Sequence, residues 1–377
     1  MSKNKVIVSV SAAVGLALLA ADAGAGGVTY RDGDKYMKLG GRIQLQYRLE
    51  NPDNGKSTDS LFFRRLRPFI EGSLHPDWKG KFQWDMGKAI NSNEIAIKDA
   101  YMEYSGFNNT KIKLGNYVFP FSREFVTSSK YQQFVERAFV GDHTYGTPDR
   151  NLGIHASGHN DGKKVTWAAS FSSASIDPGN SKLDFDSPVN RDTDFNEGWM
   201  LGGRVDFHPF GALKFSQGDF KREQKATIGV AAFTWNNDGD NNVSPGKDVA
   251  AVTGFEISGA YRNRGFSTDL EYNRFDSELE DGTVTSGLYK NGQTTLENWM
   301  VKGGYMAVPG KLELVLGYQG QDADGYATRW TRLSGGLNWF VRQHDVKYQF
   351  IYRRSSGRNG VKGDDGAEIF AQAQYVF

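Results

Sequence analysis

Cationic and hydroxyl side chains gather in one segment of the chain, residues 119–150. This segment carries Arg123, Ser128, Ser129, Lys130 and Arg137 among several aromatic residues. Guanidinium and ammonium groups offer an oxyanion charge-assisted hydrogen bonds, and serine hydroxyls offer it neutral ones. The segment is also too long for an ordinary connection in a compact domain, which marks it as functional or disordered. It is therefore a candidate anion-binding loop, although a surface loop with incidental charges has the same composition.

Long alternating strands must position this loop. In residues 36–49 apolar side chains on one parity alternate with charged and amide side chains on the other. This pattern indicates a strand with one apolar and one polar face, and its length exceeds the usual five or six residues. About sixteen such runs follow one another. They lie near residues 36–49, 63–74, 81–90, 95–104, 111–118, 151–158, 164–173, 199–208, 225–235, 250–262, 265–274, 295–307, 311–319, 328–341, 345–353 and 366–377.

The connections between the runs alternate in length. Short turn-rich links alternate with long polar loops, which is typical of a bacterial outer-membrane barrel with periplasmic turns and extracellular loops. The long loops are residues 51–60, 119–150, 176–196, 236–249, 277–294, 321–327 and 355–365. Residues 209–224 break the alternation, because they are too long for a tight turn on the periplasmic side.

The composition narrows the fold class. The chain has 377 residues, no Cys, and 45 basic against 44 acidic side chains. Only one run approaches the ~20 apolar residues of a spanning helix, so a helical membrane protein is excluded. The lack of Cys excludes disulfides, thiolate metal sites and a cysteine nucleophile, and the balanced charge gives no reason to expect nucleic acid as a partner.

The first residues look like an export signal. Residues 1–25 contain a basic start, an apolar stretch and small residues in an A-x-A pattern, which is the layout of a cleaved signal peptide. An exported chain without Cys favours the Gram-negative envelope. The chain also ends on Phe377 with Tyr375 two positions before it, which resembles the last strand of bacterial outer-membrane proteins.

These observations predict the architecture. In hydrocarbon every backbone polar group needs an internal partner, so an exported strand protein spans a membrane only as a closed barrel. We predict an all-β fold in which residues 26–377 form a transmembrane antiparallel up-and-down β-barrel of about 16 strands. Outer-membrane lipid and lipopolysaccharide would surround it. A soluble β-sandwich or an adhesin is the competing fold, and its strands would be shorter.

The polar parity predicts what lines the interior. Sixteen strands leave a water-filled lumen, so function would be permeation tuned by lumen charges. Basic residues outnumber acidic ones on this parity, which is a modest bias toward anions. The pore-lining candidates are Arg42, Lys81, Asp99 and Lys113, and Arg65 and Arg67 join the candidates for the constriction.

Several motifs then resemble the phosphate-selective porin O/P family. They are LFFRRLR at 61–67, KDAY at 98–101, LGNYVFPF at 114–121, TSSK at 127–130, ER at 136–137 and RNLG at 150–153. The resemblance implies a homotrimeric 16-stranded outer-membrane barrel whose third extracellular loop folds inward. It also implies that arginines line the approach and that a lysine-containing loop holds the anion. The matching positions are Arg64, Arg65, Ser128, Ser129, Lys130 and Arg137.

Two departures from the family pattern bear on selectivity. Phosphate-specific members carry a further lysine before the paired serines, where this chain has Phe125 and Val126. Strand parity also places Arg64 on the side of Leu66 and Ile70, so Arg64 faces the pore only if the strand starts irregularly.

The sequence therefore predicts a passive channel for small anions, with phosphate or polyphosphate as the candidate solutes. We expect no enzyme activity, cofactor or metal. A non-specific diffusion porin and a barrel scaffold for a periplasmic or extracellular partner protein are the alternatives. A hydrolase would need a motif such as G-x-S-x-G, which is absent, and residues 236–242 resemble a calcium loop without its distal Glu.

Overall fold

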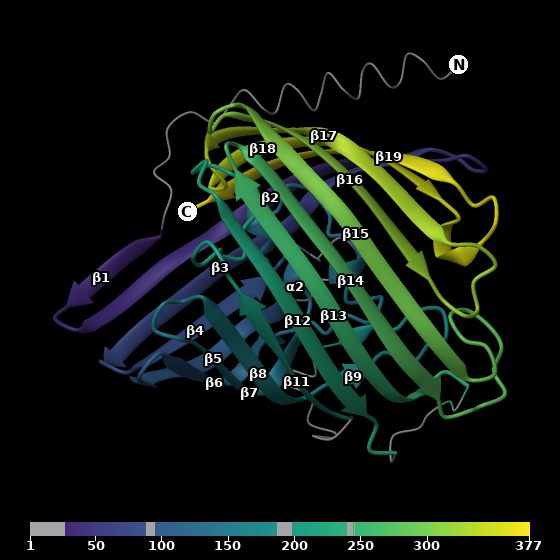
Figure 1. The fold of residues 1–377 in the computed structure, drawn as a ribbon, viewed down its shortest axis with the longest axis horizontal. Helices are drawn as coiled ribbons and strands as arrows, with labels where there is room; N and C mark the ends of the chain where they lie inside the picture. Colours follow the sequence, from purple (N-terminus) through teal and green to yellow (C-terminus); the bar gives the residue numbers. More distant parts are fainter. Residues whose placement is uncertain (1–26, 88–94, 187–197, 240–243, 245) are drawn as a thin grey trace.

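The fold is an antiparallel β-barrel (Figure 1). The computed structural model describes residues 27–87, 95–186, 198–239, 244 and 246–377. The predicted signal peptide, residues 1–25, lies outside the described residues. Among the described residues no helix is long and apolar enough to cross a membrane.

Among the described residues, sixteen strands form the closed ring. The sheet contains 17 strands, but β1 (Val28–Asp32) pairs only with the start of β2, so it extends the barrel as a hairpin. The ring consists of β2 (Lys35–Pro52), β3 (Thr58–His75), β4 (Trp78–Asp85), β5 (Ala96–Phe107), β6 (Thr110–Val118), β7 (Arg150–His159), β8 (Val165–Ser173), β11 (Trp199–Phe207), β12 (Lys225–Asn236), β13 (Val249–Asn263), β14 (Phe266–Leu279), β15 (Gln293–Val308), β16 (Leu312–Asp322), β17 (Trp330–Arg342), β18 (Val346–Ser356) and β19 (Gly366–Val376).

The ring closes between its first and last strands. Each strand pairs antiparallel with the next, β8 pairs with β11, and β19 pairs with β2 along eleven residue pairs. The predicted barrel of about sixteen strands is confirmed. Its boundaries differ by a few residues, since β3 begins at Thr58 rather than near residue 63.

The short elements lie in the connections. The pair β9 (Ser175–Ile176) and β10 (Phe185–Asp186) follows β8, and η3 (Arg358–Gly360) precedes β19. Between β6 and β7 lie α2 (Arg123–Val126), η1 (Ser129–Tyr131) and η2 (Phe139–Gly141). We call residues 119–149 the inner loop, because the contacts described below place it inside the barrel.

The two faces of the strands differ in chemistry. In β14, Leu270 points outward and is 47% exposed, whereas its neighbours Asp269 and Glu271 point inward and are almost fully buried. Alternation of this kind suits a wall between lipid and a polar interior.

An aromatic cluster packs one side of the interior. Phe121 and Phe139 of the inner loop belong to it together with side chains from β11 to β15 and β17. The ring of Phe121 meets Phe233 edge to face at 4.9 Å, and Phe139 meets Trp330 at 4.7 Å. The aromatic cluster therefore anchors the inner loop on β11 to β15 and β17.

Candidate functional site

The inner loop crosses the barrel interior. The backbone amide of Glu124 donates to Glu271 of β14 at 2.7 Å, and the amide of Phe139 donates to Gln319 of β16 at 2.8 Å. From β18, Lys347 donates to the carbonyl of Gln132 at 2.6 Å. These strand side chains all face inward, so the loop lies where the family resemblance implied. Its first helix starts at Ser122, whose hydroxyl caps the amide of Phe125 at 3.1 Å.

A bulge in β3 turns Arg64 into the lumen. Gln44 of β2 pairs with Arg65, but the adjacent Leu45 pairs with Phe63, which leaves Arg64 without a partner in the ladder. A bulge of this kind re-aims a side chain. Arg64 therefore points inward beside Arg65, and its Nε lies 2.7 Å from a carboxylate oxygen of Glu136 in the inner loop. This is the irregularity that strand parity required for Arg64 to face the pore.

A second bulge brings Lys98 inward. Gln83 of β4 pairs with Asp99 while Trp84 pairs with Ile97, so Lys98 falls between them. The Nζ of Lys98 lies 3.4 Å from a carboxylate oxygen of Asp149 at the end of the inner loop. Parity reasoning missed Lys98, and the KDAY motif was its only signal in the sequence.

Carboxylates compensate many of the basic residues on this wall. Arg67 lies 2.6 Å from Asp85, and Lys81 lies 2.6 Å from Asp99. Arg150, the first residue of β7, approaches the same Asp99 at 2.7 Å. Arg150 was not among the sequence candidates, because it precedes the alternating run. These pairs fix the wall but add little net charge.

Three arginines of the inner loop and of the facing strands β2 and β3 form no ion pair with any described carboxylate. Arg42 donates to the hydroxyl of Ser128 at 3.3 Å, and Arg65 donates to the side-chain oxygen of Gln44 at 3.0 Å. Within the described part of the chain, Arg137 donates only to two carbonyls of the inner loop, at 3.1 and 3.2 Å. The Nε atom of each guanidinium is buried without a partner among the described residues. We call Arg42, Arg65 and Arg137 the arginine group.

The arginine group concentrates positive charge without a direct ion pair, although Asp85 lies within electrostatic range of Arg42 and Glu136 within that of Arg65. Arg42 and Arg65 are 6% and 2% exposed, and both lie within electrostatic range of Arg67 and Arg137. Burial lowers the pKa of Arg137 to about 10, so this side chain is still charged at neutral pH.

A cavity of about 540 Å³ opens onto the group from the long-loop end of the barrel. Arg65 and Arg137 line it, together with Arg332 of β17 and Arg353 of β18. Glu136 also reaches the cavity. Although burial alone would raise the pKa of Glu136, Arg64 holds that pKa far below its usual value. The entrance therefore carries mainly positive charge.

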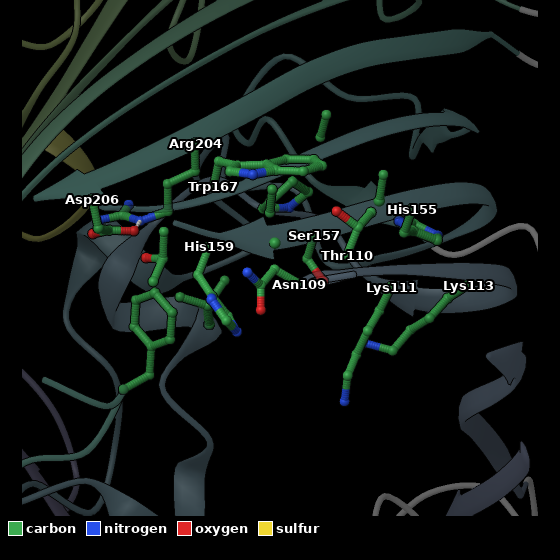
Figure 2. A pocket seen from close by; sticks show the side chains of 18 of the residues that line it. Asn109, Thr110, Lys111, Lys113, His155, Ser157, His159, Trp167, Arg204 and Asp206 are labelled. Atoms are coloured by element: carbon green, nitrogen blue, oxygen red, sulfur yellow. Dashed lines mark hydrogen bonds and ion pairs between the residues drawn. The ribbon is translucent and has the colours of Figure 1, made fainter. Parts of the chain in front are cut away.

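A second cavity, of about 650 Å³, lies between the inner loop and the wall of β6 to β8 near the short-turn end. Lys111 and Lys113 project into it side by side (Figure 2). Together with Lys79 they surround a single carboxylate, that of Glu103, at 3.4 to 3.6 Å. Lys79 also lies 3.9 Å from Glu71, so three ammonium groups face two carboxylates and this end keeps a small excess of positive charge.

Among the described residues, the remaining sequence candidates form no hydrogen bond with the arginine group, although Gln44, which accepts from Arg65, also donates to the carbonyl of Ser129 at 3.4 Å. Arg123 is 1% exposed and pairs with Asp269 of β14 at 3.3 Å, on the opposite wall. The Nζ of Lys130 lies 4.7 Å from the centre of the Tyr131 ring. Ser129 is buried, and its hydroxyl has no partner among the described residues. The described residues also contain no group of three His, Asp or Glu that could hold a metal.

The comparisons with known proteins agree with the barrel. Residues 37–210 match the family model described as phosphate-selective porin O and P. Porin O of Pseudomonas aeruginosa is 33% identical over 114 residues, which is 29% of this chain and 26% of that relative. The match therefore spans about a quarter of the relative's length.

Solved porin structures show the same fold. The anion-selective porin from Comamonas acidovorans has a TM-score of 0.62 at 14% identity, covering 91% of this chain and 100% of that one. The trimer form of OmpT of Vibrio cholerae has a TM-score of 0.55 at 14% identity, covering 90% of this chain and 99% of that one.

Proposed function

We propose that this chain, which belongs to the phosphate-selective porin O and P family and resides in the outer membrane of a Gram-negative bacterium, is a passive channel that favours small anions. The observation that carries the proposal is the arginine group. Its three guanidinium groups have no carboxylate partner among the described residues, and two of them, Arg65 and Arg137, line the basic entrance cavity.

The arginine group would attract anions and repel cations. A small anion that enters the passage loses part of its hydration shell, and buried guanidinium groups replace that shell with charge-assisted hydrogen bonds. Potassium or sodium would meet the same positive field without compensation. Selectivity in such a pore depends on lining charges rather than on diameter alone.

Phosphate is the solute class that this group would favour within the anions. Arg42 already holds the hydroxyl of Ser128, and Arg137 lies within electrostatic range of Arg42. Two cations and a hydroxyl offer an oxyanion several donors at once, whereas chloride needs no directed donors.

A non-specific diffusion porin is the second candidate function. The ion pairs Arg67–Asp85 and Arg64–Glu136 favour it, because they cancel charge beside the passage. Under this alternative, phosphate would pass without interfering with chloride.

The chloride current of purified protein in planar bilayers, with phosphate added stepwise, separates the two functions. We expect phosphate to reduce the chloride current, because it would occupy the arginine group. An unchanged chloride current would remove the oxyanion claim and leave a general porin, and a preference for cations would remove the anion channel.

We also propose a homotrimer whose residues 1–25 are removed on export. The support is the family and the trimer form of one solved neighbour. Cross-linking of the native protein would show trimers, and N-terminal sequencing would begin between residues 24 and 26. Monomers, or a chain that retains Met1, would contradict these two points.

A further inference from the structure

The connection between β11 and β12, residues 208–224, turns into the barrel. The sequence marked most of this stretch as too long for a tight turn. In the structure Gln217 is 1% exposed and Asp219 is 4% exposed. The ring of Phe220 packs edge to face on Phe340 at 4.8 Å and on His344 at 5.0 Å. The connection is thus part of the barrel interior.

Gln217 holds the inner loop through three hydrogen bonds. Its backbone amide donates to the carbonyl of Tyr131 at 3.0 Å. Its side-chain oxygen accepts from the amide of Gln133 at 2.8 Å, and its Nε2 donates to a carboxylate oxygen of Glu124 at 2.8 Å. The backbone amide, the side-chain oxygen and the side-chain nitrogen of Gln217 therefore all bind the inner loop.

The connection is fixed in turn to the short-turn end of the barrel. The carbonyl of Gln217 accepts a hydrogen bond of 2.8 Å from His344, in the turn between β17 and β18. Asp219 accepts one of 2.7 Å from the amide of Gly265, in the turn between β13 and β14. Gln217 therefore links the inner loop to rigid parts of the barrel wall.

Glu124 connects Gln217 to Arg137 of the arginine group. Its carboxylate accepts from Gln217, from Lys302 of β15, and from the amide of Ala138 at 3.3 Å. Ala138 directly follows Arg137, and the guanidinium of Arg137 donates to carbonyls next to Glu124 in the loop. The place of Arg137 in the passage thus depends on Glu124, and that of Glu124 depends on Gln217.

We propose that Gln217 is a positioning residue of the channel, which fixes the inner loop from the short-turn end and thereby sets the position of Arg137. Gln217 lines neither of the two cavities described above. It acts through the loop and touches no permeating ion. The inference rests on the proposed channel function.

The first test compares Gln217→Ala with Gln224→Ala as single channels in planar bilayers. Gln224 lies in the same connection and is exposed, so it is a matched control. Gln217→Ala removes two buried side-chain hydrogen bonds, and we expect closures about ten-fold more frequent than in Gln224→Ala. We also expect its anion preference to fall. A role confined to barrel stability would leave both readouts unchanged in folded protein.

Gln217→Glu gives an independent test. At neutral or higher pH the new carboxylate lies beside Glu124 and offers no donor, so closures increase. At low pH the introduced carboxyl group is protonated and regains a donor, so closures become as rare as in the wild-type channel. The other titratable and charged groups that face this position are Glu124, Tyr131, Arg262, Glu313, His344 and, through Glu124, Lys302. The wild-type protein, recorded over the same pH range, measures their own contribution.

Each outcome decides the proposal. The proposal would be overturned if Gln217→Ala had the same closure frequency and the same anion preference as Gln224→Ala. If the alanine variant does not fold, closures of Gln217→Glu that do not change with pH would overturn it. A wild-type channel without anion preference would refute the proposed function instead, while the closure frequencies would still test the positioning role.

Discussion

Replacement of Arg65 by glutamine removes one buried positive charge from the passage. Arg65 is 2% exposed, its Nη1 donates to Gln44 at 3.0 Å, and no described carboxylate pairs with it. Glutamine keeps a polar side chain without the charge, and the strand pairing of β3 does not depend on the guanidinium. The change is therefore electrostatic rather than structural.

The size of the effect follows from Coulomb's law. An anion that passes about 5 Å from a guanidinium gains roughly 1 kcal/mol in water-like surroundings and about 3 kcal/mol in a partly buried site. Burial also limits screening by salt. Since 1.4 kcal/mol is a factor of ten, we expect the chloride-over-potassium permeability ratio to fall at least about five-fold in Arg65→Gln.

The assay is the reversal potential of Arg65→Gln in planar bilayers under a KCl gradient. Arg274→Gln is the matched control, because Arg274 is exposed and pairs with Asp276 at 2.8 Å outside the passage. We expect the control to retain the wild-type ratio. An Arg65→Gln ratio equal to that of the control would refute the reasoning.

Three further predictions test other parts of the structure. Burial opposes protonation of His143, but its hydrogen bond to Asp184 and the nearby acidic residues outweigh burial and raise the pKa of His143. Anion preference should therefore increase as the pH falls through that raised pKa, and a matching increase in His143→Gln would contradict this role. Phe121→Ala deletes a fully buried ring that packs on Phe233, so the free energy of unfolding in denaturant should fall by about 3 kcal/mol, and an unchanged value would disprove the aromatic anchor. Leu270→Arg places a charge on the outer face of β14 and should cost about 2–4 kcal/mol on refolding into lipid vesicles, whereas no cost would show that this face does not meet lipid.

The strands and their faces were readable from the sequence. A wall with lipid on one side and polar groups on the other must alternate with a period of two, so the parity of Arg42, Arg67 and Lys113 followed from their neighbours along the chain. The inward placement of the inner loop came from the family resemblance.

The two bulges were not readable from parity. Whether Arg64 or Lys98 faces inward depends on how two adjacent strands are offset, and that offset is a property of the pairing rather than of either strand alone. The length of the β11–β12 connection was visible, but its path into the barrel depends on partners far along the chain, such as Tyr131 and His344.

Side-chain partners within the site were also hidden. Residue types in the inner loop predicted oxyanion chemistry, yet Arg123 pairs with Asp269, which lies 146 positions further along the chain. The distinction between paired and unpaired arginines, on which the proposed function depends, exists only once the barrel has closed.

The reversal potential of the wild-type channel under a tenfold KCl gradient tests the central claim most directly. Because the arginine group has no direct ion pair among the described residues, the potential should lie close to the equilibrium potential of chloride. A potential on the potassium side of zero would contradict an anion channel, whatever the positions of the individual arginines.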